Sequence, residues 1–166
     1  MKDIAQMVWA GIWVGGRTEL VIMERDPDSR TGRGYTTNSY LNALEEGFLP
    51  HYEPGTIFQQ DNARIHTSLG AREWFEEHGI WVEEWPPHSP DLNPIEPVWR
   101  MLKVRLYQLY PYLVFMGKSE ADWKHFRECM VEAWRQLDQA VIDSLILSMP
   151  RRLQAVREAK GYYIKY

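Results

Sequence analysis

Two apolar runs lie close together in the first part of the chain. Residues 7–14 (MVWAGIWV) and 18–25 (TELVIMER) are rich in apolar, aromatic and β-branched side chains, and the short segment GGR separates them. Two such runs joined by a glycine-containing connection predict the two strands of a β-hairpin. The following residues, 26–34 (DPDSRTGRG), have the composition of a loop throughout.

The next stretch alternates between helical and strand-like patterns. Apolar residues at helical spacing predict an amphipathic helix over residues 36–49 and a second helix over residues 67–79, which Gly79 closes at its C-terminal end. Short apolar runs predict buried strands at residues 56–60 (TIFQQ) and 80–85 (IWVEEW). The predicted order of two strands, helix, strand, helix and strand is typical of a mixed α/β sheet covered by helices.

The second half of the chain is predicted to be helical, starting with a long helix that begins near Pro94. Its inward-facing apolar positions fall at helical spacing: Ile95, Val98, Trp99, Leu102, Leu106 and Leu109. Ser119 stands three residues before Asp122, which is the spacing of a capping box at the start of another helix. A short helix is expected to follow and to end before Pro150.

Length and composition place the chain among ordinary globular domains. It has 166 residues, of which 45% are hydrophobic and 25% charged, so it is large enough for one hydrophobic core. We expect a single domain over residues 1–166, with the sheet in residues 7–99 and C-terminal helices in residues 100–166. The single cysteine, Cys129, excludes an internal disulfide framework.

Membrane and secretory segments are not expected. No apolar run approaches the roughly 20 residues that a membrane-spanning helix needs. Acidic Asp3 stands where a signal peptide carries basic residues. The formal net charge of −4 gives no global indication of nucleic-acid binding.

Glu96 lies in the proline-rich stretch SPDLNPIEPVW, residues 89–99. Two explanations fit this carboxylate. In the first, Asn93 is a helix N-cap, Pro94 is the first helical residue, and Glu96 returns a hydrogen bond to the Asn93 backbone. In the second, the prolines hold Glu96 rigidly so that it acts on a ligand. Pro97 favours the second explanation, because it stiffens the turn beyond what capping needs.

Asp61 ends the apolar strand predicted at residues 56–60, and Asn62 and His66 follow it. An Asp-Asn pair is typical of a turn, but acidic residues at the carboxyl ends of strands in open α/β sheets also bind ligands and metals. Asp61 and Glu96 together offer the hard oxygen ligands that Mg²⁺ or Mn²⁺ prefers. The histidines are scattered singly, so no Cys/His zinc spacing competes with this interpretation.

Three segments of the chain carry a family resemblance: FQQDNARIH, WPPHSPDLNPIEPVW and SMPRRLQAVREAKGYYIKY. They resemble the catalytic domain of the mariner superfamily of cut-and-paste DDE transposases, and VWAGIW near the start resembles the family's second core strand. The 34 residues between Asp61 and Glu96 match the spacing of one major branch of that superfamily. The resemblance extends over residues 7–166.

This resemblance implies an RNase H-like fold in which three carboxylates hold two Mg²⁺ or Mn²⁺ ions. It also implies the family reaction, which is metal-dependent cleavage of DNA phosphodiester bonds followed by strand transfer. By position, Asp61 resembles the second carboxylate of the triad and Glu96 the third. We expect Asn62, His66 and Asn93 to support these two ligands.

The family's first aspartate has no convincing counterpart. It belongs to a central strand ahead of the VWAGIW segment, where this chain has MKDIAQ and Asp3 is the one acidic residue. Loss of that strand leaves open edges on residues 7–14 and 56–60, and exposed strand edges invite pairing with other chains. We therefore expect an N-terminally truncated or domesticated transposase that is catalytically incomplete alone. It either closes the gap by rearrangement or borrows a strand from a partner, as in a homo-oligomer.

The alternative is a non-catalytic module that keeps the fold and binds nucleic acid or protein. Its basis is a set of basic residues on the long helix and in the C-terminal segment: Arg100, Lys103, Arg105, Arg151 and Arg152. They form either a face that contacts DNA phosphates or an ordinary solvated helix surface. Work on chromosomal DNA implies the nucleus in a eukaryotic host and the cytoplasm otherwise.

Overall fold

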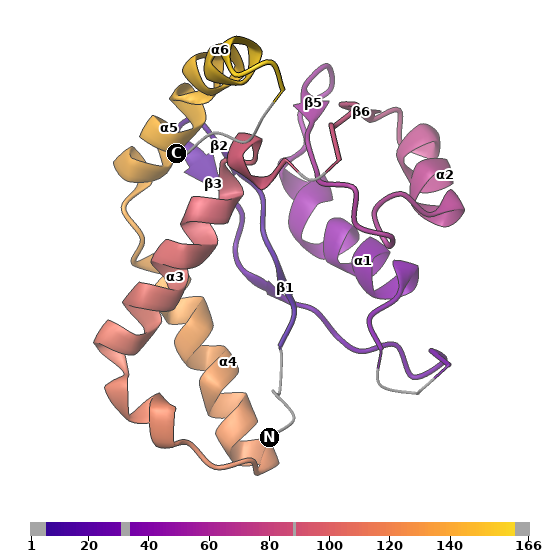
Figure 1. Cartoon of the computed structure of the whole chain (residues 1–166). Helices are drawn as coiled ribbons and strands as arrows, with labels where there is room; N and C mark the ends of the chain where they lie inside the picture. The colour runs from indigo at the N-terminus through magenta and orange to yellow at the C-terminus, as the bar shows by residue number, and fades with distance from the viewer. Residues whose placement is uncertain (1–5, 31–33, 88, 162–166) are drawn as a thin grey trace. The chain divides into compact units, whose positions relative to one another are not determined.

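The computed structural model of the chain describes residues 6–30, 34–87 and 89–161 (Figure 1). These residues form two compact units. The first unit lies within Met1–Gly11 and Val21–His88, and the second within Ile12–Leu20 and Ser89–Tyr166. None of the described helices is long and apolar enough to cross a membrane.

The first unit combines two pairs of short strands with helices. In chain order its elements are β1 (Val8–Trp9), β4 (Val21–Ile22), α1 (Thr37–Ala43), the π-helix η1 (Leu44–Phe48), the 3₁₀-helix η2 (Leu49–His51), β5 (Ile57–Phe58), α2 (Leu69–Glu77) and β6 (Trp81–Val82). β1 and β4 pair antiparallel, whereas β5 and β6 pair in parallel. Among the described residues no ladder joins one pair to the other.

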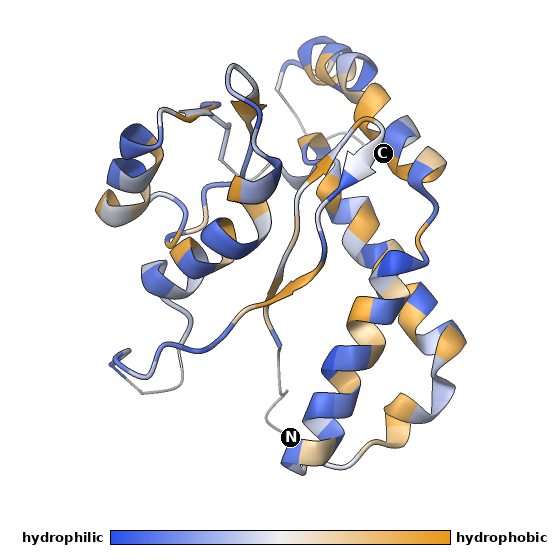
Figure 2. Ribbon diagram, turned by 180° about the vertical axis from the view of Figure 1, so that it is seen from behind, coloured by the Kyte–Doolittle hydropathy of each residue, from blue (hydrophilic) through white to orange (hydrophobic). Residues whose placement is uncertain are grey.

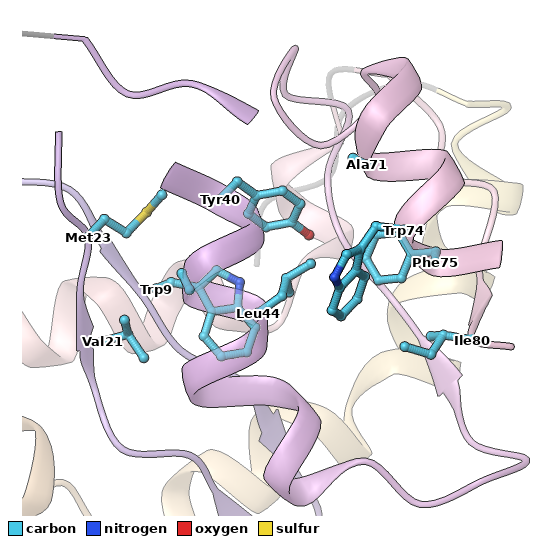
Figure 3. Packing of buried hydrophobic residues seen from close by; sticks show 10 residues of the cluster. Trp9, Val21, Met23, Tyr40, Leu44, Ala71, Trp74, Phe75 and Ile80 are labelled. Carbon is cyan, nitrogen blue, oxygen red and sulfur yellow. The ribbon is translucent and has the colours of Figure 1, made fainter. Parts of the chain in front are cut away.

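The aromatic core of this first unit gathers around α1 (Figure 3). Tyr40 and Leu44 on the helical segment are 1% and 0% exposed, and Trp9 from β1 and Phe75 from α2 pack in the same cluster. Phe48 continues it, since its ring centroid lies 4.5 Å from that of Phe58 on β5. The strands and helices of the first unit are therefore held by one continuous set of apolar contacts.

The second unit contains the tip of the hairpin and the C-terminal helices. In chain order its elements are β2 (Ile12–Trp13), β3 (Gly16–Arg17), the 3₁₀-helix η3 (Pro90–Leu92), α3 (Ile95–Leu109), the 3₁₀-helix η4 (Pro111–Phe115), α4 (Glu120–Arg135), α5 (Gln139–Leu147) and α6 (Met149–Glu158). In Figure 2 apolar and polar residues alternate along these helices, as expected of amphipathic helices packed on one side.

Polar contacts fix the hairpin tip to the helices of the second unit. The indole of Trp134, 1% exposed, donates to the Thr18 carbonyl at 2.8 Å. The Arg17 guanidinium donates to the Arg135 and Leu137 carbonyls, both at 2.9 Å. Arg135 is the last residue of α4 and Leu137 lies two residues beyond it, so Arg17 supplies positive charge and donors to this helix C-terminus.

The structure confirms the predicted hairpin and the helical second half, but it changes several boundaries. The hairpin turns at Val14 and Gly15, since Trp13 pairs with Gly16, and positive φ at Gly15 suits this tight connection. The strands are two residues long, much shorter than expected. The short helix α5 ends at Leu147, before Pro150 as predicted, and Pro150 lies in the first turn of α6, where its missing N–H is harmless.

Two helix ends follow the predictions. Gly79 follows α2 with a φ of 63°, and the next backbone N–H, from Ile80, donates to the Phe75 carbonyl at 2.9 Å. Ser119 and Asp122 form the predicted capping box at the start of α4. In both cases the signal lies within a few residues of the structure that it specifies.

Candidate functional site

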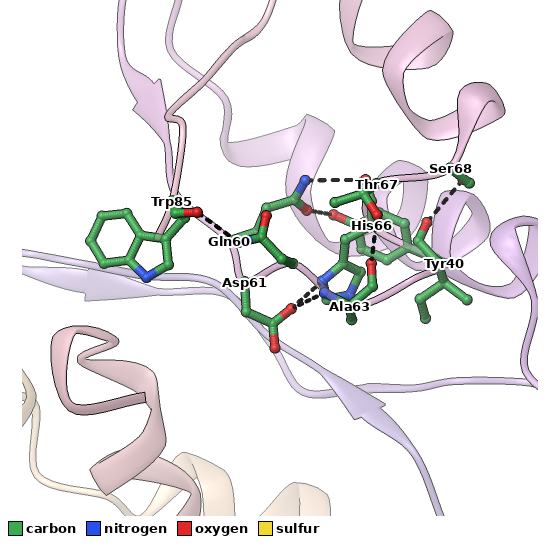
Figure 4. A network of polar contacts seen from close by, with 10 residues as sticks. Tyr40, Gln60, Asp61, Ala63, His66, Thr67, Ser68 and Trp85 are labelled. Atoms are coloured by element: carbon green, nitrogen blue, oxygen red, sulfur yellow. Dashed lines mark hydrogen bonds and ion pairs between the residues drawn. The ribbon is translucent and has the colours of Figure 1, made fainter. Parts of the chain in front are cut away.

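Asp61 lies in the first unit, just beyond the carboxyl end of β5, and its side chain is 53% exposed. Its Oδ1 atom lies 2.6 Å from His66 Nδ1 and accepts the Ala63 backbone N–H at 3.0 Å (Figure 4). The hydrogen bond from the Ala63 N–H to the Asp61 side chain closes the kind of turn that an Asp-Asn pair favours, so Asp61 does form a turn here. Both contacts use Oδ1, however, and among the described residues Oδ2 accepts no hydrogen bond.

The environment of Asp61 favours its ionised form. The hydrogen bond from His66 lowers the pKa of the Asp61 carboxyl below its usual value, and the Ala63 N–H and the charge of His66 act in the same direction. Partial burial opposes this shift but does not reverse it. A carboxylate that stays ionised and keeps one oxygen open is suited to bind a cation.

Two residues behind His66 were not identified from the sequence. The Tyr40 hydroxyl hydrogen-bonds Gln60 Oε1, and Gln60 Nε2 donates to the His66 carbonyl at 3.4 Å. The Tyr40 ring also lies against the imidazole, with 4.3 Å between ring centroids. Burial, followed by the negative charge of Asp61, raises the pKa of Tyr40, so its hydroxyl stays protonated. Tyr40 lies within the helix predicted over residues 36–49, but no sequence signal indicated its hydroxyl contact.

Asn62 supports the same corner of the first unit. Its Nδ2 donates to the Trp85 carbonyl at 2.6 Å, which ties the segment after β5 to the segment after β6. The prediction that Asn62 and His66 accompany Asp61 therefore has a geometric basis, since all three side chains act within this corner.

Glu96 lies in the second unit, in the first turn of α3, with an exposed side chain. The Asn93 backbone N–H donates to the Pro90 carbonyl at 3.1 Å, so η3 engages the donor that a capping box would use. Asn93 still helps the helix to start, since its Oδ1 accepts the Ile95 N–H at 3.4 Å. The prediction of Asn93 as the N-cap is thus one residue early, and Pro94 takes that position.

The described residues contain no group of three or more His, Cys, Asp or Glu side chains arranged to hold a metal ion. Asp61 and Glu96 belong to different compact units. Asp3, the acidic residue considered for the missing position, lies outside the described residues.

The basic residues predicted to contact DNA differ in how far their side chains are buried. Arg100, Lys103 and Arg151 have exposed side chains. Arg105 is half-buried, and its Nη2 donates to Gln136 Oε1 at 2.8 Å.

The prediction for Arg152 needs correction. It is 3% exposed, its Nε donates to Ser148 Oγ at 2.8 Å, and its Nη1 donates to the Asp91 carbonyl at 2.9 Å. Arg152 therefore holds α6 to η3 and does not face DNA. Its position four residues after Ser148, on the inward side of an amphipathic helix, is the physical reason.

Comparison with known proteins agrees with the fold and the motifs. The model of the DDE superfamily endonuclease family matches residues 29–111, half of the chain. The Tc1 transposase of Caenorhabditis elegans is 46% identical over 129 residues, which cover 78% of this chain and 44% of that protein. The Tc3 transposase of the same organism is 30% identical over 96% of this chain and 45% of its own length. The chain thus spans less than half the length of these curated relatives.

Solved structures show the same fold. The Mos1 strand transfer complex superposes with a TM-score of 0.62 at 20% identity, covering 99% of this chain and 46% of that one. The Mos1 transposase catalytic domain solved with raltegravir and Mg gives a TM-score of 0.56 at 20% identity, covering 81% of this chain and 67% of that one. The fold is therefore the RNase H-like α/β fold that was expected, and the chain belongs to the DDE superfamily endonuclease family.

Proposed function

We propose that this chain is the catalytic-domain part of a cut-and-paste DNA transposase, whose reaction is metal-dependent cleavage and transfer of DNA strands. Membership of the endonuclease family and the similarity to the Tc1 transposase support the reaction class. The similarity to Mos1, solved in a strand transfer complex and with Mg or Mn, supports DNA as the substrate and a divalent metal as the cofactor. Such a protein acts where the host keeps its chromosomal DNA, which is the nucleus in a eukaryote.

One observation carries the proposal at the level of the site. The Asp61 carboxylate follows a strand of a parallel pair, stays ionised, and is held through one oxygen while the other accepts no hydrogen bond from the described residues. Carboxyl ends of parallel strands are common positions for ligands in open α/β sheets. The oxygen chemistry of Asp61 and Glu96 fits Mg²⁺ or Mn²⁺.

Each residue has a defined part in this proposal. Asp61 and Glu96 supply carboxylate oxygens to the metal ions, and His66 and the Ala63 N–H hold Asp61 Oδ1 so that Oδ2 keeps a fixed direction. Asn62 anchors the backbone beside Asp61 to Trp85. When bound, a pair of divalent ions activates a water or 3′-hydroxyl and stabilises the leaving oxygen of the phosphodiester.

The triad needs a third carboxylate, and we propose that it comes from outside the described residues. Asp3 is one source, and a further chain is another. A two-metal site that lacks one ligand loses both metal affinity and positioning, so we expect the chain alone to have little activity.

The Phe48 ring lies 6.4 Å from the Trp9 ring on β1 and 4.5 Å from the Phe58 ring on β5, as distances between centroids, so one side chain links the two strands. Since no ladder joins β1 to β5 among the described residues, we propose that an extended segment of a partner or second copy pairs between them.

A second candidate function is nucleic-acid binding without catalysis. The exposed side chains of Arg100 and Arg151 favour it, because exposed basic residues bind phosphates without any metal. The two candidates differ in one respect: cleavage requires Asp61, Glu96 and metal, and binding requires none of them.

The test compares the chain with its Asp61→Asn and Glu96→Gln variants by two measurements. Mn²⁺ binding is followed by electron paramagnetic resonance, and nicking of supercoiled plasmid is followed with Mn²⁺, Mg²⁺ or EDTA. We expect each variant to weaken Mn²⁺ binding by about tenfold or more, since each removes one of few charged ligands. We expect nicking by the unmodified chain to be slight, to need metal and to be lost in both variants.

A matched control is Glu76→Gln, which removes an exposed carboxylate from α2. Mn²⁺ binding that is equal in all four proteins would overturn the assignment of Asp61 and Glu96. Nicking that persists in EDTA, or in both site variants, would overturn the metal-dependent reaction. A folded chain that binds DNA but neither binds Mn²⁺ nor nicks the plasmid would support the binding module instead.

A further inference from the structure

We propose that a hollow in the second unit is a binding subsite for one nucleotide of a DNA strand, with Arg105 as its anchor. It has a volume of about 370 Å³ and is lined by Arg100, Val104, Arg105 and Gln108 of α3 and by Gln136 and Leu137 at the end of α4. A volume of this size lies in the range of small-ligand pockets and suits a single nucleotide unit. The proposal rests on DNA being the partner of the proposed function.

The charges of the hollow suit a phosphate. Two guanidinium groups line it, and guanidinium is the side chain best matched to phosphate oxygens because it donates through two parallel N–H bonds. The one acidic residue of the lining, Asp138, uses its carboxylate to cap α5, where it accepts the Ala140 N–H at 2.9 Å. The net charge of the ionised lining is therefore positive.

Arg105 is held in place but not fully satisfied. Gln136 Oε1 accepts from its Nη2 at 2.8 Å, and Gln136 is itself held because its Nε2 donates to Glu132 at 2.9 Å. The Arg105 Nε atom is buried and has no hydrogen-bond partner among the described residues. The contact with Gln136 holds the guanidinium in one orientation beside the hollow, so a phosphate oxygen there meets a pre-oriented charged donor.

Met101, Val104 and Leu137 give the lining an apolar part, which suits a sugar or a base. Val104 is 53% exposed and Leu137 is 8% exposed, so the hollow offers carbon surface that water covers in the free protein. A free phosphate ion gains nothing from this surface. A strand of DNA gains from both parts, with a phosphate at the arginines and a deoxyribose or base on the apolar floor.

Lys103 provides a matched comparison on the same helix. It is exposed on α3, carries the same charge and does not line the hollow. A diffuse basic surface uses Lys103 and Arg105 alike, whereas a built subsite depends on Arg105 and Arg100.

The experiment measures binding of a fluorescein-labelled DNA duplex and of its single strand by fluorescence anisotropy, in EDTA and at several salt concentrations. We expect Arg105→Gln and Arg100→Gln to weaken binding by about fivefold or more and to lower the salt slope by about one. We expect Lys103→Gln to change the affinity by about twofold or less. Arg105→Lys keeps the positive charge but loses the planar guanidinium with its paired N–H donors. It is therefore expected to restore only part of the DNA affinity that Arg105→Gln loses.

A second readout does not depend on affinity. The Arg105 Nε–H resonance, assigned by its absence in Arg105→Lys, is expected to shift when the unlabelled duplex is added and to stay unchanged with inorganic phosphate at the same concentration. Circular dichroism confirms that each variant is folded. Equal losses for Lys103→Gln and Arg105→Gln, or an Arg105 resonance that does not move, would overturn the subsite.

Failure of the subsite and failure of the proposed cleavage remain distinguishable. Binding in EDTA involves no metal, and the Asp61→Asn protein is expected to bind DNA with the same dependence on Arg105. Metal-dependent nicking with no effect of Arg105 overturns the subsite alone. An Arg105-dependent complex with no Mn²⁺ binding overturns the cleavage proposal alone.

Discussion

At the scale of single residues, the Asp61 carboxylate links local structure to pH. Because its pKa is lowered in the folded chain, it adds stability above its ordinary pKa of 3.8, and that stability is lost as the pH falls through the lower folded value. We expect Asp61→Asn to lower the free energy of unfolding at neutral pH by less than about 1 kcal/mol, since the group is half exposed. The difference between the two proteins is expected to shrink as the pH falls below 3.8 and to be lost as it passes through the lower pKa of the folded chain.

Urea unfolding followed by tryptophan fluorescence at neutral and acidic pH measures this difference. Glu76→Gln is again the control, because it removes one exposed carboxylate from the same unit. A stability difference for Asp61→Asn that is the same at both pH values would contradict the ionic origin of the effect.

Single residues also show what a sequence can and cannot predict about this site. Asp61, Asn62 and His66 were predicted together because strand, turn and motif signals coincide within a few residues. The contact of Tyr40 with Gln60 was missed because these residues are twenty positions apart, and only the packing of α1 brings the hydroxyl there. Arg152 was misjudged because composition does not say which side of an amphipathic helix is buried.

At the scale of elements, Gly47 lets the π-helix η1 approach the antiparallel pair β1–β4. A Cβ added at Gly47 lies 2.6 Å from Val21 Cγ2 and 2.8 Å from Trp9 Cζ3, closer than atoms in real structures come. Both neighbours are buried and cannot move freely. We expect Gly47→Ala to lower the free energy of unfolding by about 1–3 kcal/mol through overpacking, despite the better helix propensity of alanine.

Gly70 in α2 provides the control for that measurement. A Cβ there meets Thr37 Cγ2 at 3.5 Å, which is an ordinary contact. Gly70→Ala is therefore expected to be neutral or stabilising by up to about 1 kcal/mol. Urea unfolding of both variants decides the matter, and equal effects would mean that the close approach at Gly47 is not what the glycine provides.

Element boundaries were predictable where a short local signal specifies them. The Ser119 capping box and the Gly79 helix end were confirmed, because each depends on residues three to five positions apart. The start of α3 was placed one residue early, because η3 uses the Asn93 N–H that a capping box requires. Strand lengths were overestimated because apolar composition does not reveal whether a neighbouring strand is there to complete a ladder.

At the scale of the whole molecule, the family membership and the RNase H-like fold were predictable from three motifs. The motifs predict both the site and the fold, because they contain the candidate metal ligands and also residues of the elements that position them. We expected a single domain in which the sheet ends at residue 99 and C-terminal helices follow, and this stays a prediction. The expectation that the chain is catalytically incomplete alone also stays a prediction. Both depend on what pairs with the strands of the first unit, and sequence patterns within one chain do not specify a partner.

No ladder joins β1 to β5 among the described residues, and this leads to a prediction about assembly. A second copy is the strand donor that a purified preparation contains, so we expect association that grows with concentration in sedimentation velocity. Amide hydrogen exchange at β1 and β5 is expected to slow as the associated form accumulates, because new ladder bonds protect those amides.

Two lysine substitutions distinguish association by strand pairing from non-specific association through exposed apolar side chains. Ile57, on β5, and Leu69, at the start of α2, are 60% and 73% exposed. Ile57→Lys places a charge on the strand edge, which natural sheets use to block pairing, and is expected to weaken association by about tenfold. Leu69→Lys removes as much exposed apolar surface without touching a strand and is expected to leave association unchanged. A monomer at every concentration, or equal effects of the two substitutions, would exclude a second copy as the donor of the missing strand.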